Sequence, residues 1–344
     1  MALAVPSGAP QPNSTPGITA RHAGPAVSVV VVNFCQWRNT ARLTRQLRRC
    51  DAVRARSAEV VVVDNNSGPH PLASRLRKLR GVRLRRFGRN YGFAKAVNRA
   101  ARAARGEWLL LLNPDVTVEE GFLDEVLVAA ARAEPDVGVI GFALRNPDGS
   151  RQASAGPYPT LARTLGGLLR PRARRKCRHV SSEACSAVAW VTGGCFLVRR
   201  SCFDQLNGLD DRYFLYYEDV DFCRRARAAG WSVWYEPKLG AVHHSPLHAR
   251  SVPPPLRLIT RHALLTYAHR HWPAWQSRLL GSIIWAEACI RERLAPPADR
   301  DGYRELRAVV GDVLAGRAAL ARKRVRFAAR FLDRISAAQD RRTS

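Results

Sequence analysis

Three carboxylates stand close together in the segment YFLYYEDVDFCRRARAAGW (213–231), namely Glu218, Asp219 and Asp221. Aromatic and apolar residues precede them and several arginines follow. A carboxylate beside an apolar wall can serve as a general base, because desolvation and nearby cations tune its pKa. The same pattern also suits an ordinary helix, with acid in its first turn, arginine near its end and Gly230 as its stop. The residues alone therefore leave a catalytic and a purely structural interpretation open.

A second group of side chains has the chemistry of a metal site. The buried run LLLLNPD ends in Asn113, Pro114 and Asp115, and two histidines, His243 and His244, follow much later. Carboxylate oxygens suit Mg²⁺ or Mn²⁺, and such a cation can be held against a diphosphate. An imidazole from His243 or His244 could complete the site. The alternatives are a helix cap at Asp115 and structural histidines.

Two further motifs suggest contacts to a phosphorylated ligand. In VVVDNNS, Asp64 and Asn65 end a strand, where a carboxylate can accept hydrogen bonds from a base or a ribose; the alternative is an Asx-turn. In GRNYGFAKAVNRA, Gly92 opens a predicted helix whose N-terminus favours phosphate. Ordinary glycine turn chemistry is the alternative there.

Buried strands alternate with helices in the segment that must position these side chains. Continuous apolar runs predict strands at 27–33, 59–65, 82–87, 107–114 and 137–144, and helical patterns lie between them at 38–50, 71–80, 93–105 and 119–134. This alternation predicts an α/β fold with an open, doubly wound, mainly parallel, Rossmann-like sheet. Ligands of such sheets bind outside the carboxyl ends of the strands, so Asn33, Asp64 and Asp115 are expected at one edge.

The rest of the chain is organised differently. Residues 187–200 predict a strand, a Gly-Gly break and a second strand or helix start, and two short strands joined by a turn are expected at 232–237 and 240–245. Residues 257–338 are helical in pattern and rich in Arg and Ala. The first 26 residues lack a signal-peptide pattern and are predicted to be a disordered tail.

Composition narrows the class of protein. The net charge is +28, which favours anionic partners such as nucleotide phosphates or an anionic membrane. The fingerprints of dinucleotide-binding, P-loop and α/β-hydrolase proteins are absent from the sequence, as is any apolar run long enough to cross a membrane.

Taken in order, the motifs resemble the inverting glycosyltransferases of family 2, which have the GT-A fold, and look most like their rhamnosyltransferase-like subset. The matching motifs are VSVVVVN, VVVDNNS, NYGFAKAVN, LLLNPDV, VGVIGFALRNPDGS, VTGGCFLVRR, LDDRYFLYYEDVDFCRRARAAGW and AVHHS. They span residues 27–250, which the resemblance divides into a nucleotide-binding half (27–145) and an acceptor or catalytic half (146–250). A disordered tail (1–26) and a basic, helical C-terminal extension (251–344) complete the expected domain organisation.

The resemblance assigns roles to individual residues. Asp219 would be the catalytic base, with Glu218 beside it, while Asp115 and His243 would bind Mg²⁺ or Mn²⁺, with His244 as the rival ligand. The remaining residues would bind the nucleotide sugar: Asn33, Asp64, Asn65, Gly92, Asn113, Gly193 and Gly194. One departure is that the frequent Asp-x-Asp metal motif begins here with Asn113, which should weaken metal affinity.

The resemblance also implies substrates and partners. The donor would be dTDP-rhamnose, or a UDP- or GDP-sugar, and the acceptor a polyprenyl-linked or cell-envelope glycan. The basic extension suits an anionic membrane surface, so we expect a cytoplasmic protein bound peripherally at the inner face of the plasma membrane. A nucleotide-sugar-binding homologue without catalysis and a nucleic-acid-binding protein are the alternatives; the second lacks any reader motif, and no nucleic-acid partner is expected.

Overall fold

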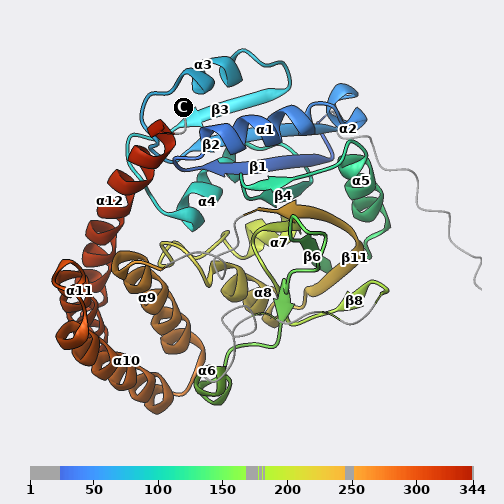
Figure 1. Ribbon diagram of the computed structural model, residues 1–344. Helices are drawn as coiled ribbons and strands as arrows, with labels where there is room; N and C mark the ends of the chain where they lie inside the picture. The colour runs from blue at the N-terminus through green and yellow to red at the C-terminus, as the bar shows by residue number, and fades with distance from the viewer. Residues whose placement is uncertain (1–23, 168–176, 178–179, 181–182, 245–251, 343–344) are drawn as a thin grey trace, which may run out of the picture.

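A mixed nine-stranded sheet forms the centre of the protein (Figure 1). The computed structural model describes residues 24–167, 177, 180, 183–244 and 252–342. The strands of this sheet run in the order β3-β2-β1-β4-β10-β6-β11-β5, and β8 pairs with β11. Their bounds are β1 (Val27–Asn33), β2 (Ala58–Asp64), β3 (Val82–Arg86), β4 (Trp108–Leu112), β5 (Val116–Thr117), β6 (Val137–Arg145), β8 (Ser186–Ala187), β10 (Cys195–Arg199) and β11 (Ser232–His243). A separate pair consists of β7 (Ala155–Gly156) and β9 (Trp190–Val191).

The first half of the sheet has the predicted parallel topology. Strand β1 pairs in parallel with β2 and β4, and β2 pairs in parallel with β3. Strand β10 then enters antiparallel between β4 and β6, and β6 pairs in parallel with β11. The five strands predicted within residues 27–144 are confirmed to within two residues at each end. The pairs formed among β1, β2, β3 and β4 are all parallel, and the antiparallel strand β10 makes the whole sheet mixed.

Helices cover both faces of the sheet because every second residue of each central strand points to the same side. Val29 and Val31 belong to a core cluster shared with α1 (Trp37–Leu47), α2 (Asp51–Arg54) and α5 (Phe122–Arg132). Val30 and Val32 belong to a second cluster, shared with α4 (Phe93–Ala103) and α8 (Glu218–Ala228). Both faces of β1 and β2 are fully buried, as their uninterrupted valine runs predict.

One prediction about the second half is wrong. The two short strands expected at 232–237 and 240–245 form a single strand, β11, with an irregularity in its pairing to β6 between Glu236 and Gly240. A Cβ atom at Gly240 would collide with the carbonyl oxygen of Ala143 on β6. The Pro237 and Gly240 signals therefore mark a bulge that lets the strand continue, instead of a turn that ends it.

The C-terminal region is helical, as predicted. It contains α9 (Pro254–His271), α10 (Ala274–Leu294), α11 (Pro297–Leu314) and α12 (Ala318–Arg342), which lie together beside the sheet domain (Figure 1). Buried residues from α9 to α12 belong to the same core cluster as those of α4 and α8, so the C-terminal helices share a continuous core with the sheet domain. Among the described residues, no helix is both long and apolar enough to cross a bilayer.

The remaining short helices are α3 (Pro71–Arg77), α6 (Leu161–Gly167) and α7 (Arg200–Gln205). The predicted tail lies outside the described residues up to position 23, and most of the basic segment 170–179 lies outside them too. At the start of the described chain, the backbone N–H of Ala26 already donates to Ser57, 2.8 Å away.

Candidate active site

Polar residues from three neighbouring strands meet at one edge of the sheet. Asn33 at the end of β1 lies in register with Asp64 at the end of β2. On the other side of β1, Val31 pairs with Leu112, the last residue of β4, so that Asn113 follows at the same edge. The convergence expected from the parallel topology is therefore present.

Asn33 and Asp64 are held tightly by the protein itself. The side-chain amide of Asn33 donates to Oδ1 of Asp64 and to Oγ of Ser67, both at 3.0 Å. Oδ2 of Asp64 accepts from Nε of Arg86 at 3.1 Å, and neither Asn33 nor Asp64 exposes any surface. A buried carboxylate needs such partners, and these contacts give both residues a structural task at the predicted nucleotide pocket.

Asn65 and Gly92 join this edge to the segment in front of the three carboxylates. The Asn65 side chain accepts from the N–H of Tyr91 at 2.9 Å and donates to Oδ1 of Asn90 at 2.8 Å. Gly92 has a φ of +82°, and a Cβ there would collide with the carbonyl oxygen of Phe214. That oxygen accepts the N–H of the first residue of α4, at 2.7 Å. The N-terminus of α4 thus meets the 214–217 segment directly.

Asp115 lies beside His243, as the predicted metal site requires. Oδ1 of Asp115 is 3.4 Å from Nε2 of His243, and both residues are buried. The pairing of β5 with β11 produces this contact, because it sets His243 opposite Val116, the residue that follows Asp115.

The hydrogen bonds around His243 leave Nε2 suited to bind a metal. Nδ1 lies 3.0 Å from Oε1 of Gln152, and the amide nitrogen of Gln152 donates to the backbone oxygen of His243 at 2.8 Å. With Gln152 oriented in this way, the neutral ring of His243 has its proton on Nδ1 and a lone pair on Nε2. Nε2 is buried and has no hydrogen-bond partner among the described residues. The donor set therefore fits a divalent cation.

His244 points elsewhere. Its Nε2 lies 3.0 Å from Oγ1 of Thr117, and its backbone N–H donates to the carbonyl oxygen of Asp115 at 2.9 Å. Burial, and then the positive charge of Arg42, lower the pKa of His244 below its usual value. No group of three or more His, Cys, Asp or Glu side chains gathers as a metal site anywhere in the described part of the chain.

The segment that holds Gly193 and Gly194 connects Asn113, at the end of β4, to Asp219. The N–H of Asn113 donates to the oxygen of Gly194 at 3.0 Å, and the N–H of Gly193 donates to Oδ2 of Asp219, also at 3.0 Å. Asp219 and Glu218 open helix α8 and are 6% and 5% exposed. The structure thus brings the two carboxylate motifs together at the edge where Gly193 and Gly194 lie.

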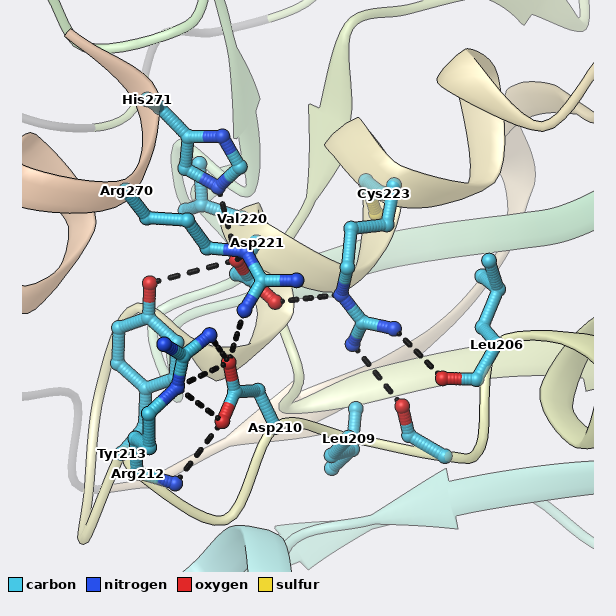
Figure 2. Close-up of polar contacts among 12 residues, drawn as sticks. Leu206, Leu209, Asp210, Arg212, Tyr213, Val220, Asp221, Cys223, Arg270 and His271 are labelled. Carbon is cyan, nitrogen blue, oxygen red and sulfur yellow. Dashed lines mark hydrogen bonds and ion pairs between the residues drawn. The ribbon is translucent and has the colours of Figure 1, made fainter.

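Asp221 has a different task from its two neighbours. It is fully buried. Its carboxylate accepts a hydrogen bond from Nε of Arg225 at 2.7 Å and lies 2.8 Å from Nε2 of His271 (Figure 2). Arg270 adds a second guanidinium, whose Nε lies 3.3 Å from Oδ1 of Asp221. The third acid of the motif is therefore bound into a network of structural ion pairs that reaches the C-terminal helices.

The comparison with protein families decides the identity. Residues 28–206 match the model of the family described as glycosyl transferase family 2. The chain is a family 2 glycosyltransferase. A relative from Mycobacterium tuberculosis (strain CDC 1551 / Oshkosh), N-acetylglucosaminyl-diphospho-decaprenol L-rhamnosyltransferase, is 35% identical over 260 residues, which cover 69% of this chain and 83% of the relative.

Other similarities agree with this assignment. The rhamnosyltransferase WbbL of Escherichia coli (strain K12) is 29% identical over 163 residues, which cover 46% of the chain and 61% of that protein. In three dimensions the enzyme resembles GalNAc-T7, solved with UDP, GalNAc and Mn²⁺, with a TM-score of 0.50 and 16% identity over 83% of this chain and 55% of that one. The expected GT-A-like α/β fold and rhamnosyltransferase-like membership of the family are thus confirmed.

Several residues of the site escaped the sequence reasoning. Gln152, which contacts His243, is 91 positions from it in the sequence, and Arg86, which donates to Asp64, is 22 positions from that residue. Contacts over such separations leave no local sequence pattern. Arg270 and His271 lie on α9, outside the residues that match the family model. Only the spacing of Asp221 and Arg225 along one helix face was visible in the sequence.

Proposed function

We propose that the enzyme transfers L-rhamnose from dTDP-rhamnose to a lipid-linked or cell-envelope glycan, with inversion at the anomeric carbon. The names of the M. tuberculosis and E. coli relatives support the choice of sugar, and the first of them supports a polyprenyl-diphosphate acceptor. Cell-envelope polysaccharide synthesis is the process in which such a transfer belongs.

The observation that carries the proposal is the bridge from Asn113 through Gly194 and Gly193 to Asp219. It sets a buried general-base candidate next to the strand end that carries Asp115. Glycosyl transfer needs both features close together, because the acceptor hydroxyl must lose a proton where the donor diphosphate departs. A Cβ at Gly194 would come within 3.2 Å of a methyl group of Leu144, whereas one at Gly193 would make ordinary contact with Asp219, 3.6 Å from its Cβ.

In the proposed mechanism Asp219 takes the proton from the acceptor hydroxyl as its oxygen attacks the anomeric carbon. A new C–O bond forms, the bond from that carbon to the diphosphate breaks, and the nucleoside diphosphate leaves from the opposite face. The N–H of Gly193 holds Oδ2 of Asp219 in place, at 3.0 Å. Glu218 lies beside it and positions the acceptor, while Asn33, Asp64, Asn65 and Gly92 form the nucleotide pocket.

Asp115 and His243 are the residues that would hold a divalent cation. Mg²⁺ or Mn²⁺ bound there would supply positive charge to the departing diphosphate. The chain itself contributes Nε2 of His243, whose ring is oriented by Gln152, and a buried carboxylate on Asp115. Asn113 and Gly194 lie next to this pair and belong with the donor-sugar contacts.

The substitution Asp219→Asn tests the proposal directly. It keeps the size of the side chain and its contact to Gly193 but removes the base, so kcat for transfer to a synthetic prenyl-diphosphate N-acetylglucosamine should fall by about 10²–10⁴-fold. The nucleotide-induced rise in melting temperature should stay. Asp211→Asn is the matched control, since Asp211 is 54% exposed and pairs only with Lys95 among the described residues. Unchanged turnover in Asp219→Asn would disprove the role of Asp219.

The donor nucleotide can be identified separately by melting temperatures measured with dTDP, UDP or GDP, each with and without Mn²⁺. Stabilisation by dTDP that depends on Mn²⁺ is expected. Stabilisation by UDP or GDP alone would replace rhamnose by another sugar and leave the mechanism standing. Binding of dTDP-rhamnose without any transfer would indicate a homologue that binds the nucleotide sugar but does not catalyse.

The same proposal places the enzyme at the inner face of the plasma membrane, docked on anionic lipid. Helix α10 exposes an apolar face to solvent, made up of Trp275, Leu279, Ile283, Ile290 and Leu294, which are 36–80% exposed. Ile283, Ile290 and Leu294 also line a groove of about 670 Å³ between α10 and the start of α11.

Two arginines make this face complementary to an anionic surface. Arg278 and Arg293 are exposed on α10 and pair with no acid among the described residues. Exposed tryptophan and aliphatic side chains beside free arginines are the pattern of helices that lie in a membrane interface. The occupant we assign to the α10 face is therefore an anionic lipid bilayer.

A further inference from the structure

We propose that Arg270 and His271, in the last turn of α9, are positioning residues for Asp219. They act through Asp221, which they hold two residues further along helix α8. The inference rests on the proposed role of Asp219 as the base. It makes the end of α9, which lies outside the residues matched by the family model, a part of the active site.

Asp221 depends on α9 for part of its hydrogen bonding. Its side chain has no exposed surface, and its partners come from two helices: Arg225 from α8 itself, and Arg270 and His271 from α9 (Figure 2). Tyr213 adds a weaker contact at 3.4 Å. A buried carboxylate that loses one of its partners keeps an acceptor oxygen that is no longer satisfied, which favours movement of the segment that carries it or entry of water.

Arg270 also ties down the segment before α8. Its guanidinium bonds Asp210, which pairs with Arg212 as well, and it reaches Asp221 at the same time (Figure 2). One side chain of α9 thus connects the two ends of the stretch from Asp210 to Asp221, within which Glu218 and Asp219 lie.

The backbone is strained next to the base. Tyr216 and Tyr217 have φ values of 71° and 67°, a left-handed conformation that is unfavourable for tyrosine. Such strain persists only where surrounding contacts impose it. The ring of Tyr217 contacts the ring of Tyr267 on α9, with centroids 5.7 Å apart, and Tyr267 contacts His271 in turn at 4.7 Å.

A further contact runs in the opposite direction, from α8 to α9. Arg224 donates to the hydroxyl of Tyr267 at 3.1 Å and to the carbonyl oxygen of His271 at 3.3 Å. A cation at the last carbonyl groups of a helix also complements its dipole. The last two turns of α9 therefore contact three residues in or next to the start of α8, namely Tyr217, Asp221 and Arg224.

The consequence for catalysis follows from the geometry of Asp219. Its carboxylate is placed by the first turn of α8 and by the N–H of Gly193. If the contacts from α9 are lost, the first turn of α8 is free to shift. A displacement of about 1 Å at a reacting group can lower the rate by about 10²-fold. Asn33 ends β1 and Asp64 ends β2, and neither contacts Arg270 or His271 in any interaction seen among the described residues. Loss of the α9 contacts should therefore leave the predicted nucleotide pocket in place.

The test uses three variants of the full chain. His271→Leu removes the donor to Asp221 while keeping side-chain bulk, and His271→Gln places an amide N–H where Nε2 donates. Arg261→Gln is the control on the same helix, because Arg261 pairs with Glu287 on α10 and contacts no residue of α8 in any interaction seen among the described residues. Asp219→Asn is measured beside them as the variant without a base.

For turnover, His271→Leu should lower kcat by roughly 10–100-fold with the KM for dTDP-rhamnose within about twofold of wild type. His271→Gln should restore most of kcat, and Arg261→Gln should match wild type. Full activity of His271→Leu beside an inactive Asp219→Asn would overturn the positioning role alone. Equal activity of Asp219→Asn and wild type would instead overturn the proposed function.

A readout that needs no substrate completes the design. Hydrogen exchange of the peptide covering 213–223 should accelerate about tenfold or more in His271→Leu and stay at the wild-type rate in His271→Gln and Arg261→Gln. Unchanged exchange in His271→Leu would overturn the inference whichever sugar the enzyme transfers. Equal acceleration in all three variants would also overturn it, since it would indicate general loosening of the C-terminal helices.

Discussion

At the scale of single residues, the contacts of His243 set it apart from its neighbour His244. Nδ1 of His243 lies against Oε1 of Gln152, so that in the neutral ring the lone pair remains on Nε2, on the side of Asp115. His244 is adjacent in sequence but is turned toward Thr117. One histidine of the pair thus faces Asp115, and the other contacts Thr117 on β5.

We expect His243→Gln to remove the part of the nucleotide-induced thermal stabilisation that depends on Mn²⁺, and His244→Gln to keep it. Loss of an outer hydrogen bond to a ligand already lowers metal affinity by about 10–100-fold, so loss of the ligand itself should cost at least as much. The measurement is a titration of Mn²⁺ at saturating nucleotide, followed by melting temperature. The reverse result, with His244→Gln the sensitive variant, would exclude His243 as the ligand.

At the scale of elements, the start of α4 controls how two distant segments meet. Gly92 lets the carbonyl oxygen of Phe214 reach the first N–H of the helix, and Phe214 lies two residues before the strained pair Tyr216 and Tyr217. A sequence motif that suggested phosphate binding therefore also has a packing reason. Helix α4 and helix α8 share one core cluster beneath this contact.

Gly92→Ala should destabilise the enzyme by about 1–3 kcal/mol from backbone strain, and by more because the new Cβ meets the Phe214 oxygen. A loss of several degrees in melting temperature is expected, together with a lower kcat. Gly88→Ala is the control four residues earlier, where a Cβ meets nothing within 4 Å. Equal stability of the two variants would contradict this account of Gly92.

At the scale of the whole molecule, charge and exposed apolar surface point to the same partner. The chain carries a net charge of +28, and the C-terminal helices place an apolar face with free arginines on the outside. Burying that face in a lipid interface would remove apolar surface from water while the arginines meet anionic headgroups.

The triple variant Trp275→Ser, Ile290→Ser, Leu294→Ser should bind vesicles of equal parts phosphatidylglycerol and phosphatidylcholine roughly tenfold or more weakly than wild type. Binding of wild type should also fall with added salt. Val128→Ser on α5 is the control, since Val128 is 47% exposed but lies away from α10. Co-sedimentation measures the bound fraction. Undiminished binding by the triple variant would assign the membrane contact to another surface.

Local patterns in the sequence predicted the strands and helices of the first half and the family, because valine runs, helical spacing and turn residues act over a few positions. They also predicted which residues reach the carboxyl edge, since parallel strands end there together. Asn33, Asp64 and Asp115 are found at that edge. The roles of these residues toward a donor, and the division of the chain into two halves and an extension, stay predictions.

Only the tertiary structure decided which histidine faces Asp115, why Asp221 accompanies Asp219, and that β11 is one strand. The pairing of β11 with β5 sets His243, the last residue of the strand, opposite Val116, whereas His244 lies just beyond the strand and contacts Thr117. Asp221 is contacted by Arg270 and His271 from a helix that begins 33 residues after it along the chain, and such a contact has no local signature in the sequence. The chemistry was thus readable from residue types, whereas its geometry depends on contacts between segments that are distant in sequence.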